Sequence, residues 1–313
     1  MKRSVVWCLV LAMGLMCFGG IQAEAKDSMK VIYSKNDFML DVMVAQEKGF
    51  FEMLDLDFEP IHMTGPMTLS GLQRDEVSGC FTSSPAALAA NQSGMRLIMV
   101  SGLGLRSFDY YVLADSPIQS IHDFEGKRIG NSAPPGGPAF GLTYDMEKLG
   151  IKAEIIIIRN ASQRASALLS GNVDAVYGTP YFKAQFGSQV RKVHTSTITK
   201  YLWNSCGWWF KPDYIEKHPL AIKKFVDGQL MGRFFIRNNP KEALDIMARQ
   251  LNLDLTQFKE PVPIPYFDMP ITVYQYGLQK TAEILVKYGH LKAVPDVTRL
   301  VDPRFSVVID QDY

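Results

Sequence analysis

Two short motifs in this sequence combine residue types that can bind an anion. Ser84-Pro85 and Thr179-Pro180 each follow a short apolar run of the kind that forms a β-strand. Ser or Thr before Pro is typical of a helix start, because the hydroxyl caps a free backbone amide and Pro is tolerated in the first turn. The unpaired amides and the helix dipole favour negative charge. The motifs predict ligand-binding helix N-termini, although Ser/Thr-Pro also begins helices that bind nothing.

A third candidate turn runs from Asn131 to Pro138 and contains the adjacent glycines Gly136 and Gly137. Adjacent glycines let the backbone approach a ligand closely and let successive amides point at one anion. The turn lacks the Gly-Lys-Ser/Thr ending of a phosphate-binding P-loop and is not a dinucleotide fingerprint. We expect Ser132, Gly136 and Gly137 to line a ligand site, with an ordinary strand-to-helix turn as the alternative.

Several aromatic side chains and one arginine lie close to these turns in the sequence. Aromatic residues at strand ends can stack on a planar or apolar ligand, whereas most others pack inside. The candidates for stacking are Phe38, Tyr181 and either Trp203 or Trp208. Arg106 lies between two expected strands and could bind a carboxylate or sulfonate through two parallel hydrogen bonds. A solvent-exposed position for Arg106 is equally compatible with the sequence.

No spacing in the sequence indicates a metal site or a catalytic group. The histidines are scattered, and Cys80 and Cys206 match no metal-ligand signature. No Ser-His-Asp or paired-carboxylate arrangement can be proposed from spacing, so we expect no metal, no cofactor and no enzymatic activity. An oxidising compartment would allow the two cysteines to pair, but we favour two buried free thiols.

The elements that must position these turns alternate along the chain. Short apolar strands and helical stretches follow one another, which is typical of an α/β fold with mostly parallel sheets. The strand candidates are residues 29–34, 56–62, 79–82, 95–101, 108–114, 128–131, 154–159, 173–177 and 191–198. The helix candidates are residues 38–49, 67–74, 85–92, 138–149, 162–170 and 180–186, followed by 213–217, 219–237, 240–250 and 270–288.

An approximate internal repeat relates the two halves of this pattern. Leu69-Ser70-Gly71 and Leu169-Ser170-Gly171 each precede a short strand that ends close to a Ser/Thr-Pro motif. Such a repeat predicts two similarly built lobes whose ligand-binding turns face each other across a cleft. Chance similarity between two strand-helix units is the alternative.

Residues 1–25 have the layout of a secretory signal peptide. Lys2 and Arg3 precede an apolar run, Val5 to Phe18, and the small residues that follow end at Ala25. The apolar run is shorter than the roughly 20 residues that a membrane-spanning helix needs. We therefore predict export to the periplasm, with cleavage near Ala25.

Two further observations concern the exported chain. The bulky Met16 before Cys17 argues against a lipid anchor at that cysteine. The chain has 33 basic and 32 acidic residues, so its net charge points neither to nucleic acid nor to an anionic membrane as a partner.

Several stretches resemble one family of exported binding proteins. Residues 31–51, together with Leu56-Asp57-Phe58, resemble the solute-binding proteins of the nitrate, sulfonate and taurine import group, which includes thiamine-pyrimidine-precursor-binding proteins with an NMT1/THI5-like domain. Ile121 to Gly130 resembles the strand entry DLKGKKIG of this group, and Leu169 to Ala175 resembles its L..G.VDA element. The resemblance covers roughly residues 29 to 237.

The resemblance implies a two-lobed periplasmic-binding-protein fold of type II, in which each lobe is a mixed, mostly parallel sheet flanked by helices. Lobe 1 would comprise residues 26–104 and 206–313, and lobe 2 would comprise residues 105–205, with two hinge crossings. Ligand contacts in such proteins come from the loop after the first strand and from the strand-end turns. They map onto Asn36, Asp37, Phe38, Thr82, Ser83, Ser84, the turn from Ser132 to Pro138, Thr179 and Tyr181.

The first of these loops departs from the family pattern. Many relatives carry Trp there, whereas this chain has Ser34-Lys35-Asn36-Asp37. A carboxylate at Asp37 could hold a ligand amine or ring nitrogen, so the ligand need not be a pure anion.

The resemblance further implies the extracytoplasmic solute-binding component of an ABC importer. Such a protein is a monomer that closes on a small-molecule ligand and delivers it to a permease in the inner membrane, with no nucleic acid partner. A sulfonate, a carboxylate and a pyrimidine-like heterocycle all fit the expected site. The alternatives are a cofactor-independent lyase on the same fold and a ligand sensor that docks on a membrane receptor.

Overall fold

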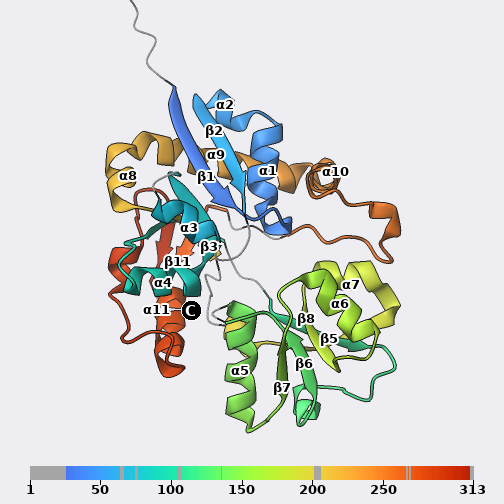
Figure 1. Ribbon diagram of the computed structural model, residues 1–313. Coiled ribbons are helices and arrows are strands. Elements are labelled where there is room, and N and C mark those ends of the chain that lie inside the picture. Colours follow the sequence, from blue (N-terminus) through green and yellow to red (C-terminus); the bar gives the residue numbers. More distant parts are fainter. Residues whose placement is uncertain are drawn as a thin grey trace, which may run out of the picture.

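Two five-stranded sheets, one above the other in Figure 1, form the centre of the protein in this computed structural model. The structure describes residues 26–63, 67–74, 77–103, 107–134, 136–200, 206–265, 267 and 269–310. The expected leader over residues 1–25, Arg106 and Trp203 lie outside the described residues. We call the part of the molecule built on the first sheet lobe 1 and the part built on the second sheet lobe 2.

The sheet of lobe 1 has the strand order β2-β1-β3-β10-β4. Strand β1 is parallel to β2 and β3, whereas β10 runs antiparallel to both of its neighbours. The strands are β1 (Asp27–Tyr33), β2 (Leu56–His62), β3 (Gly79–Ser83), β4 (Ile98–Leu103) and β10 (Cys206–Phe210).

The sheet of lobe 2 repeats this arrangement in the order β7-β6-β8-β5-β9. Strand β6 is parallel to β7 and β8, and β5 is antiparallel to β8 and β9. The strands are β5 (Asp109–Leu113), β6 (Arg128–Asn131), β7 (Glu154–Ile157), β8 (Ala175–Gly178) and β9 (Val190–Thr195). The fourth strand is the antiparallel one in both sheets, so the predicted repeat and the predicted fold class are confirmed.

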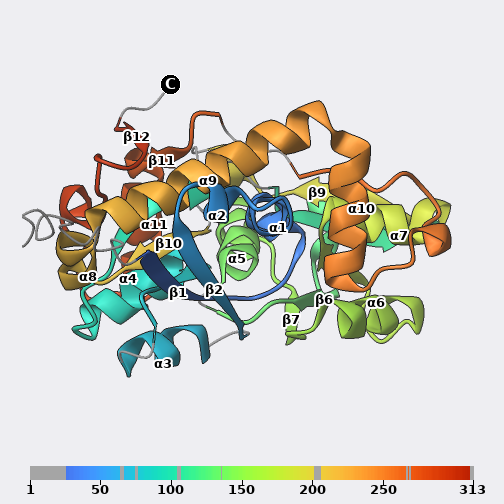
Figure 2. The same cartoon turned by 90° about the horizontal axis from the view of Figure 1, so that it is seen from above.

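Helices cover both faces of each sheet, as Figures 1 and 2 show. Lobe 1 carries α1 (Leu40–Glu47), α2 (Phe50–Met53), α3 (Met67–Gln73), α4 (Ser84–Gln92), α8 (Pro212–Lys217), α9 (Pro219–Asn238), α10 (Pro240–Leu251) and α11 (Gln275–Lys287). Lobe 2 carries α5 (Gly137–Leu149), α6 (Ala161–Leu169) and α7 (Pro180–Phe186). Of the helices in the described ranges, none is long and apolar enough to cross a bilayer.

The burial of the strands follows from this double cover. Successive side chains of a strand point to opposite faces. Val31 and Tyr33 pack into a cluster with α1 and α9, whereas Ile32 packs with α3, α4 and α11. In β5, likewise, Tyr110 packs on the face covered by α5, and Tyr111 packs on the face covered by α6 and α7. Because both faces are buried there, the inner strands β5 and β8 read as mostly apolar runs, whereas the edge strand β2 keeps polar residues between apolar ones.

Helix α9 lies across lobe 1 and packs closely on α1 (Figure 2). A side chain at Gly232 would place its Cβ 2.2 Å from the carbonyl oxygen of Asp41, so only glycine allows this approach. Next to it, the Nε of Arg233 donates to the Asp41 carboxylate at 2.8 Å, and both side chains are almost fully buried. Pairing offsets the cost of removing these charges from water.

Three short strands correct the predicted elements. Strand β10, β11 (Thr272–Tyr274) and β12 (Val307–Ile309) were not expected from the sequence. The predicted helix over residues 270–288 begins only at Gln275, because residues 272–274 pair in parallel with β12. Pairing with a distant segment therefore overrides the local helical pattern there.

The two lobes also meet outside the crossings. Residues 252–265, which we call the strap, follow α10 and extend to α7, where the amides of Lys259 and Glu260 donate to Ala184 O at 3.0 and 3.1 Å. On the other side of the molecule, Lys287 of α11 forms an ion pair with Glu147 of α5 at 2.8 Å. The lobes are thus held together on two sides. The limits of the lobes at residues 104–105 and 205–206 stay a prediction.

Candidate ligand-binding site

A cavity of about 200 Å³ lies where the two lobes meet, and we call it the interlobe cavity. Its walls come from the loop after β1, the first crossing, the start of α7 and the end of the strap. The lining residues are Asp37, Phe38, Leu103, Ser107, Thr179, Pro180, Tyr181, Pro263, Ile264 and Pro265. The structure therefore brings together four of the predicted site residues, Asp37, Phe38, Thr179 and Tyr181.

Asn36 positions the first wall of the cavity. Its Oδ1 accepts a hydrogen bond from Phe38 N at 3.0 Å, and its Nδ2 donates to Ser34 O at 3.1 Å. Asn36 thereby caps a short 3₁₀ turn over Asp37–Met39 and fixes the loop that presents Asp37 and Phe38. The predicted site residue Asn36 thus supports its neighbours from outside the lining.

The opposite wall begins where β8 ends. Thr179 is the N-cap residue of α7 and Pro180 is its first residue, as the sequence predicts, but the Thr179 side chain makes no capping hydrogen bond. Its hydroxyl is therefore not used to hold the helix end. The first turn of α7 presents Thr179 and Tyr181 to the cavity.

Tyr181 is the most informative side chain of this wall. Its ring meets Phe258 of the strap edge-to-face at 5.0 Å, and its hydroxyl is buried with no hydrogen-bond partner among the described residues. Burial, and then the negative charge of Asp37, raise the pKa of Tyr181 to about 12. The phenol is therefore protonated at neutral pH. A buried polar group without a partner is costly, so the hydroxyl is available to a ligand.

The two other predicted turns do not contribute to the described lining of the interlobe cavity. In the first, helix α4 begins one residue earlier than the sequence suggests. Ser83 is the N-cap and accepts from Ala86 N at 3.3 Å, while Ser84 is the buried first residue of the helix. Thr82 lies within β3, opposite Gly207. The Ser83 hydroxyl is therefore already occupied by the hydrogen bond that caps α4.

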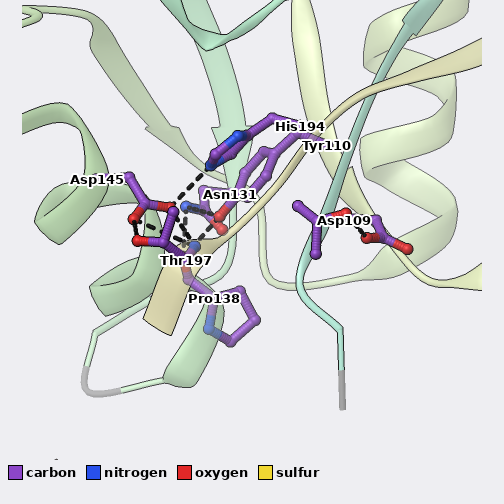
Figure 3. A network of polar contacts seen from close by, with 8 residues as sticks. Asp109, Tyr110, Asn131, Pro138, Asp145, His194 and Thr197 are labelled. Atoms are coloured by element: carbon purple, nitrogen blue, oxygen red, sulfur yellow. Dashed lines mark hydrogen bonds and ion pairs between the residues drawn. The ribbon is translucent and has the colours of Figure 1, made fainter. Parts of the chain in front are cut away.

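The glycine turn before α5 is held by a polar network (Figure 3). The Tyr110 hydroxyl donates to Pro138 O at 2.7 Å, and Asn131 Nδ2 donates to the Tyr110 oxygen at 3.2 Å. A Cβ at Gly137 would lie 2.5 Å from the Phe108 ring, so packing alone requires this glycine. Gly136 is the N-cap of α5. Ser132 keeps a buried hydroxyl without a partner among the described residues.

A second network in Figure 3 anchors the chain where it leaves lobe 2. Asp145 of α5 accepts from Thr197 N at 3.0 Å and lies 2.8 Å from His194 Nε2. Burial acts to raise the pKa of Asp145, but hydrogen bonds from His194 and Thr197 outweigh it and hold the pKa below its usual value. The network joins α5 to the segment after β9. Nothing in the spacing of these three residues signals their contact.

Trp208 is a core residue, which corrects its prediction as a stacking residue. It is 1% exposed and packs edge-to-face on Tyr33, Phe81 and Phe225. The reason is that β10 lies inside the sheet and turns Trp208 toward α9. A ligand in the interlobe cavity does not reach this side chain.

The cysteines and possible metal ligands complete the description. Cys80 and Cys206 form no disulfide, as preferred from the sequence, but only Cys80 is buried, whereas Cys206 is partly exposed. Burial raises the pKa of Cys80 to about 12. Among the described residues, no group of three or more His, Cys, Asp or Glu side chains is placed to hold a metal ion.

The strap supplies three lining residues that were not predicted from the sequence; Leu103 and Ser107 of the first crossing are the others. Pro263, Ile264 and Pro265 follow α10, far along the chain from the other walls. Their closeness to lobe 2 depends on the contacts of Lys259 and Glu260 with α7. A proline-rich run in the sequence signals an extended segment but does not signal where it lies.

Comparison with known proteins gives the same fold. A Haemophilus influenzae protein named for thiamine biosynthesis is 29% identical over 180 residues, which are 56% of this chain and 57% of that protein. The chain thus spans less than two thirds of that relative's length. The aliphatic sulphonate binding protein SsuA of Escherichia coli matches with a TM-score of 0.72 and 15% identity, over 89% of this chain and 98% of its own.

Two further structures share this fold. The nitrate-binding protein NrtA of Synechocystis has a TM-score of 0.69 and 13% identity, over 90% of this chain and 87% of its own. The desulfurization enzyme DszB has a TM-score of 0.62 and 16% identity, over 89% of this chain and 97% of its own. At these identities the likeness establishes the fold of periplasmic binding proteins and leaves the ligand open.

The family follows from a match over more than half of the sequence. The family profile described as NMT1/THI5 like matches residues 37–243, from the first wall of the interlobe cavity to α10. This chain therefore belongs to the NMT1/THI5-like family.

Proposed function

We propose that this protein is the extracytoplasmic solute-binding component of an ABC importer. The observation that carries the proposal is the interlobe cavity, whose walls come from both lobes. The protein would be exported after cleavage near Ala25, act as a monomer and pass its ligand to a permease in the inner membrane. The names of SsuA and NrtA, which share the fold, support the binding of a small solute.

The lining favours a planar heterocycle that carries an amino group. Phe38, Tyr181 and the prolines of the strap provide apolar surfaces for a flat ring. Asp37 can accept hydrogen bonds from an amine or a ring N–H, and the Tyr181 hydroxyl can donate to a ring nitrogen or carbonyl. The relative named for thiamine biosynthesis is in keeping with such a ligand. A small organic anion is the other class that fits the fold.

The test is a thermal-shift screen with amino-heterocycles, sulfonates and carboxylates, followed by calorimetry of each compound that stabilises the protein. We expect Tyr181→Phe to weaken binding about fivefold, since a neutral hydrogen bond contributes about 1 kcal/mol. Asp37→Asn should weaken an amine ligand more, because it removes a charged acceptor. Tyr214→Phe is the matched control, since the Tyr214 hydroxyl donates to Ser28 O on the surface of lobe 1. Unchanged affinity in both cavity variants would contradict the proposed site.

An enzyme on the same fold is the second candidate, supported by the likeness to DszB. Mass spectrometry of a confirmed ligand after incubation with the protein distinguishes the two. A solute-binding protein returns the ligand unchanged, whereas an enzyme converts it.

A further inference from the structure

A second cavity of about 550 Å³ adjoins the interlobe cavity, and we call it the side cavity. It lies between the strap and the first turns of α6 and α7. Thr179 and Tyr181 line both cavities. Tyr181 therefore lies between the two spaces, and its buried hydroxyl has no partner among the described residues.

Arg164 of α6 lines the side cavity and is only 6% exposed. Its Nε donates to Tyr177 O at 3.1 Å, and its Nη1 donates to Ile158 O at 2.7 Å and Arg159 O at 3.1 Å. A guanidinium has five N–H donors in a fixed plane. Among the groups that the structure describes, none accepts from Nη2, so two donors remain for another partner.

The charge of Arg164 is also uncompensated within the described part of the chain. Among the described residues it forms no ion pair, and its guanidinium carbon lies 5.1 Å from the centre of the Tyr177 ring. Asp254 is the acidic residue in the described lining, and its carboxylate accepts hydrogen bonds from Thr256 and Gln257. Burial lowers the pKa of Arg164, yet an arginine stays protonated at any physiological pH. A buried cation without a counter-charge is unfavourable. The site thus favours the arrival of an anion.

Arg191 shows what a purely structural arginine looks like in this chain. Its Nε donates to Ala114 O, and its Nη2 donates to Ser116 O and Ile118 O. Like Arg164 it binds three carbonyl oxygens, but it is partly exposed and does not line the side cavity. An arginine of this chain can therefore bind three carbonyl oxygens without being buried beside a cavity.

The backbone of α6 does not provide the anion site alone. The Asn160 side chain accepts from the amides of Ser162 and Gln163 at 2.8 and 3.2 Å, so the capping residue already occupies these donors. The anion site at this end of lobe 2 therefore needs side-chain donors, and Arg164 provides two.

We propose that Arg164 is the receptor for an anionic group of the captured solute, a carboxylate, sulfonate or phosphate bound in the side cavity. The inference rests on the proposed function and deepens it, because it assigns a ligand with two parts. The ring lies in the interlobe cavity, and the anionic group passes Tyr181 and pairs with Arg164 in the side cavity.

The test uses inorganic phosphate, methanesulfonate and acetate as probes, with binding measured by thermal shift and calorimetry. At least one of these anions should stabilise the unaltered protein. Arg164→Gln should weaken it roughly tenfold or more, as expected for hydrogen bonds to a charged group, and Arg164→Lys should keep part of the affinity. Arg191→Gln is the matched control, because it also removes three carbonyl contacts and should leave anion binding unchanged.

A second variant keeps the test valid if Arg164→Gln does not fold. Ser162→Asp adds a carboxylate to the wall of the same cavity and leaves the three carbonyl contacts of Arg164 intact. An acidic residue in the first turn also suits the helix dipole, so the variant should fold. We expect it to lose anion binding, because the new carboxylate in the cavity wall repels an anion beside Arg164.

The outcomes separate this inference from the proposed function. The role of Arg164 is overturned if no anion stabilises the protein, or if the anion binds equally well to Arg164→Gln and Ser162→Asp. Heterocycle binding that depends on Asp37 and Tyr181 would then still support the solute-binding function. Anion binding that is lost in both variants supports the role of Arg164, even if no heterocycle is found.

Discussion

Asp37 and Tyr181 face one cavity from different lobes, and their chemistry is complementary. The carboxylate accepts hydrogen bonds, whereas the phenol, whose pKa is raised by burial and by Asp37, donates one. A heterocycle edge with one donor and one acceptor would satisfy both groups at once. Such an edge is typical of amino-substituted rings. The pair would therefore select a ligand by its hydrogen-bonding pattern as well as by its size.

Single residues also show which parts of the site could be predicted from the sequence and which could not. Asp37 and Phe38 could be predicted as site residues from the resemblance to binding proteins, and Tyr181 from the Thr179-Pro180 helix start at the end of a strand. Trp208 could not be placed correctly, because Trp208 and Trp209 point to opposite faces and the sequence does not say which face is covered by which helix. Arg164 was missed because its carbonyl partners come from two separate strand ends.

Asp145 provides a prediction about stability and pH. Its pKa is held below its usual value in the folded protein, so its ionised form adds stability above the unfolded-state pKa of about 4. This contribution is lost as the pH falls through the folded-state pKa. We expect Asp145→Asn to be less stable than the unaltered protein at pH 7, with a difference that narrows below about pH 4.

Urea denaturation at a series of pH values checks this expectation. Asp227→Asn, on the exposed side of α9, serves as the control for the loss of one acidic residue. A stability difference between Asp145→Asn and the unaltered protein that stays constant from pH 7 to pH 3 would contradict the role of this network.

Among the helices and strands, local sequence signals predict some elements correctly, whereas pairing with distant segments forms the strands that the sequence does not predict. Pro180, Pro219 and Pro240 each begin a helix where the sequence predicts one, because Pro fixes the backbone of the first turn. Strand β10 was missed, since its partners β3 and β4 lie more than a hundred residues earlier. Residues 272–274 of β11 lie within a predicted helix but form a strand, because they pair with β12, which follows α11.

The contact between α1 and α9 provides an element-scale prediction. Gly232→Ala would place a methyl group 2.2 Å from the Asp41 carbonyl, so the two helices must separate. We expect a loss of about 1–3 kcal/mol in the free energy of unfolding, typical of an overpacked core. Chemical denaturation measures it. Phe234→Ala, at an exposed position of α9, should change stability far less, and an equal loss in both variants would argue against close packing as the cause.

For the whole molecule, contacts on two sides hold the lobes around the cavity. Lys183 of α7 pairs with Glu260 of the strap at 2.7 Å, and Lys287 of α11 pairs with Glu147 of α5 at 2.8 Å. Phe140 of α5 also stacks on Tyr288. A ligand that touches both lobes would stabilise the same arrangement, so binding and lobe closure are expected to be coupled.

Removing both ion pairs should shift this equilibrium toward open lobes. The pairs are partly exposed, so each contributes at most about 1 kcal/mol. Glu260→Ala together with Glu147→Ala should therefore weaken ligand binding by up to roughly thirtyfold, because the ligand must now close the lobes itself. Small-angle scattering should show a larger radius of gyration without ligand and compaction with it.

Asp227→Ala is the control, because it removes an exposed ion pair within α9 that joins no lobes. If the double variant and the unaltered protein give the same scattering curve, both without and with ligand, the closure of the two lobes is contradicted.

The two-lobed plan itself could be read from the sequence repeat, because each half carries the same order of strands and glycine-ended helices. Gly49 and Gly150 both adopt a left-handed backbone at corresponding helix ends. The strap could not be predicted from the repeat, because it has no counterpart in the other half. Its place depends on α7, which lies in the other lobe.

The pairing of strands at the crossings has a consequence for protein engineering. Leu103 pairs with Cys206 where the chain leaves and re-enters lobe 1, and Asp109 pairs with Thr195 where it enters and leaves lobe 2. All strands of lobe 2 thus belong to one uninterrupted stretch whose two ends are neighbours. Lobe 2 is in effect an insertion in a loop of lobe 1, and inserted domains with adjacent ends tolerate exchange. The part of the proposed ligand site that lies in lobe 2 is therefore a single cassette. Exchanging it for the corresponding stretch of a relative should give proteins of mixed specificity.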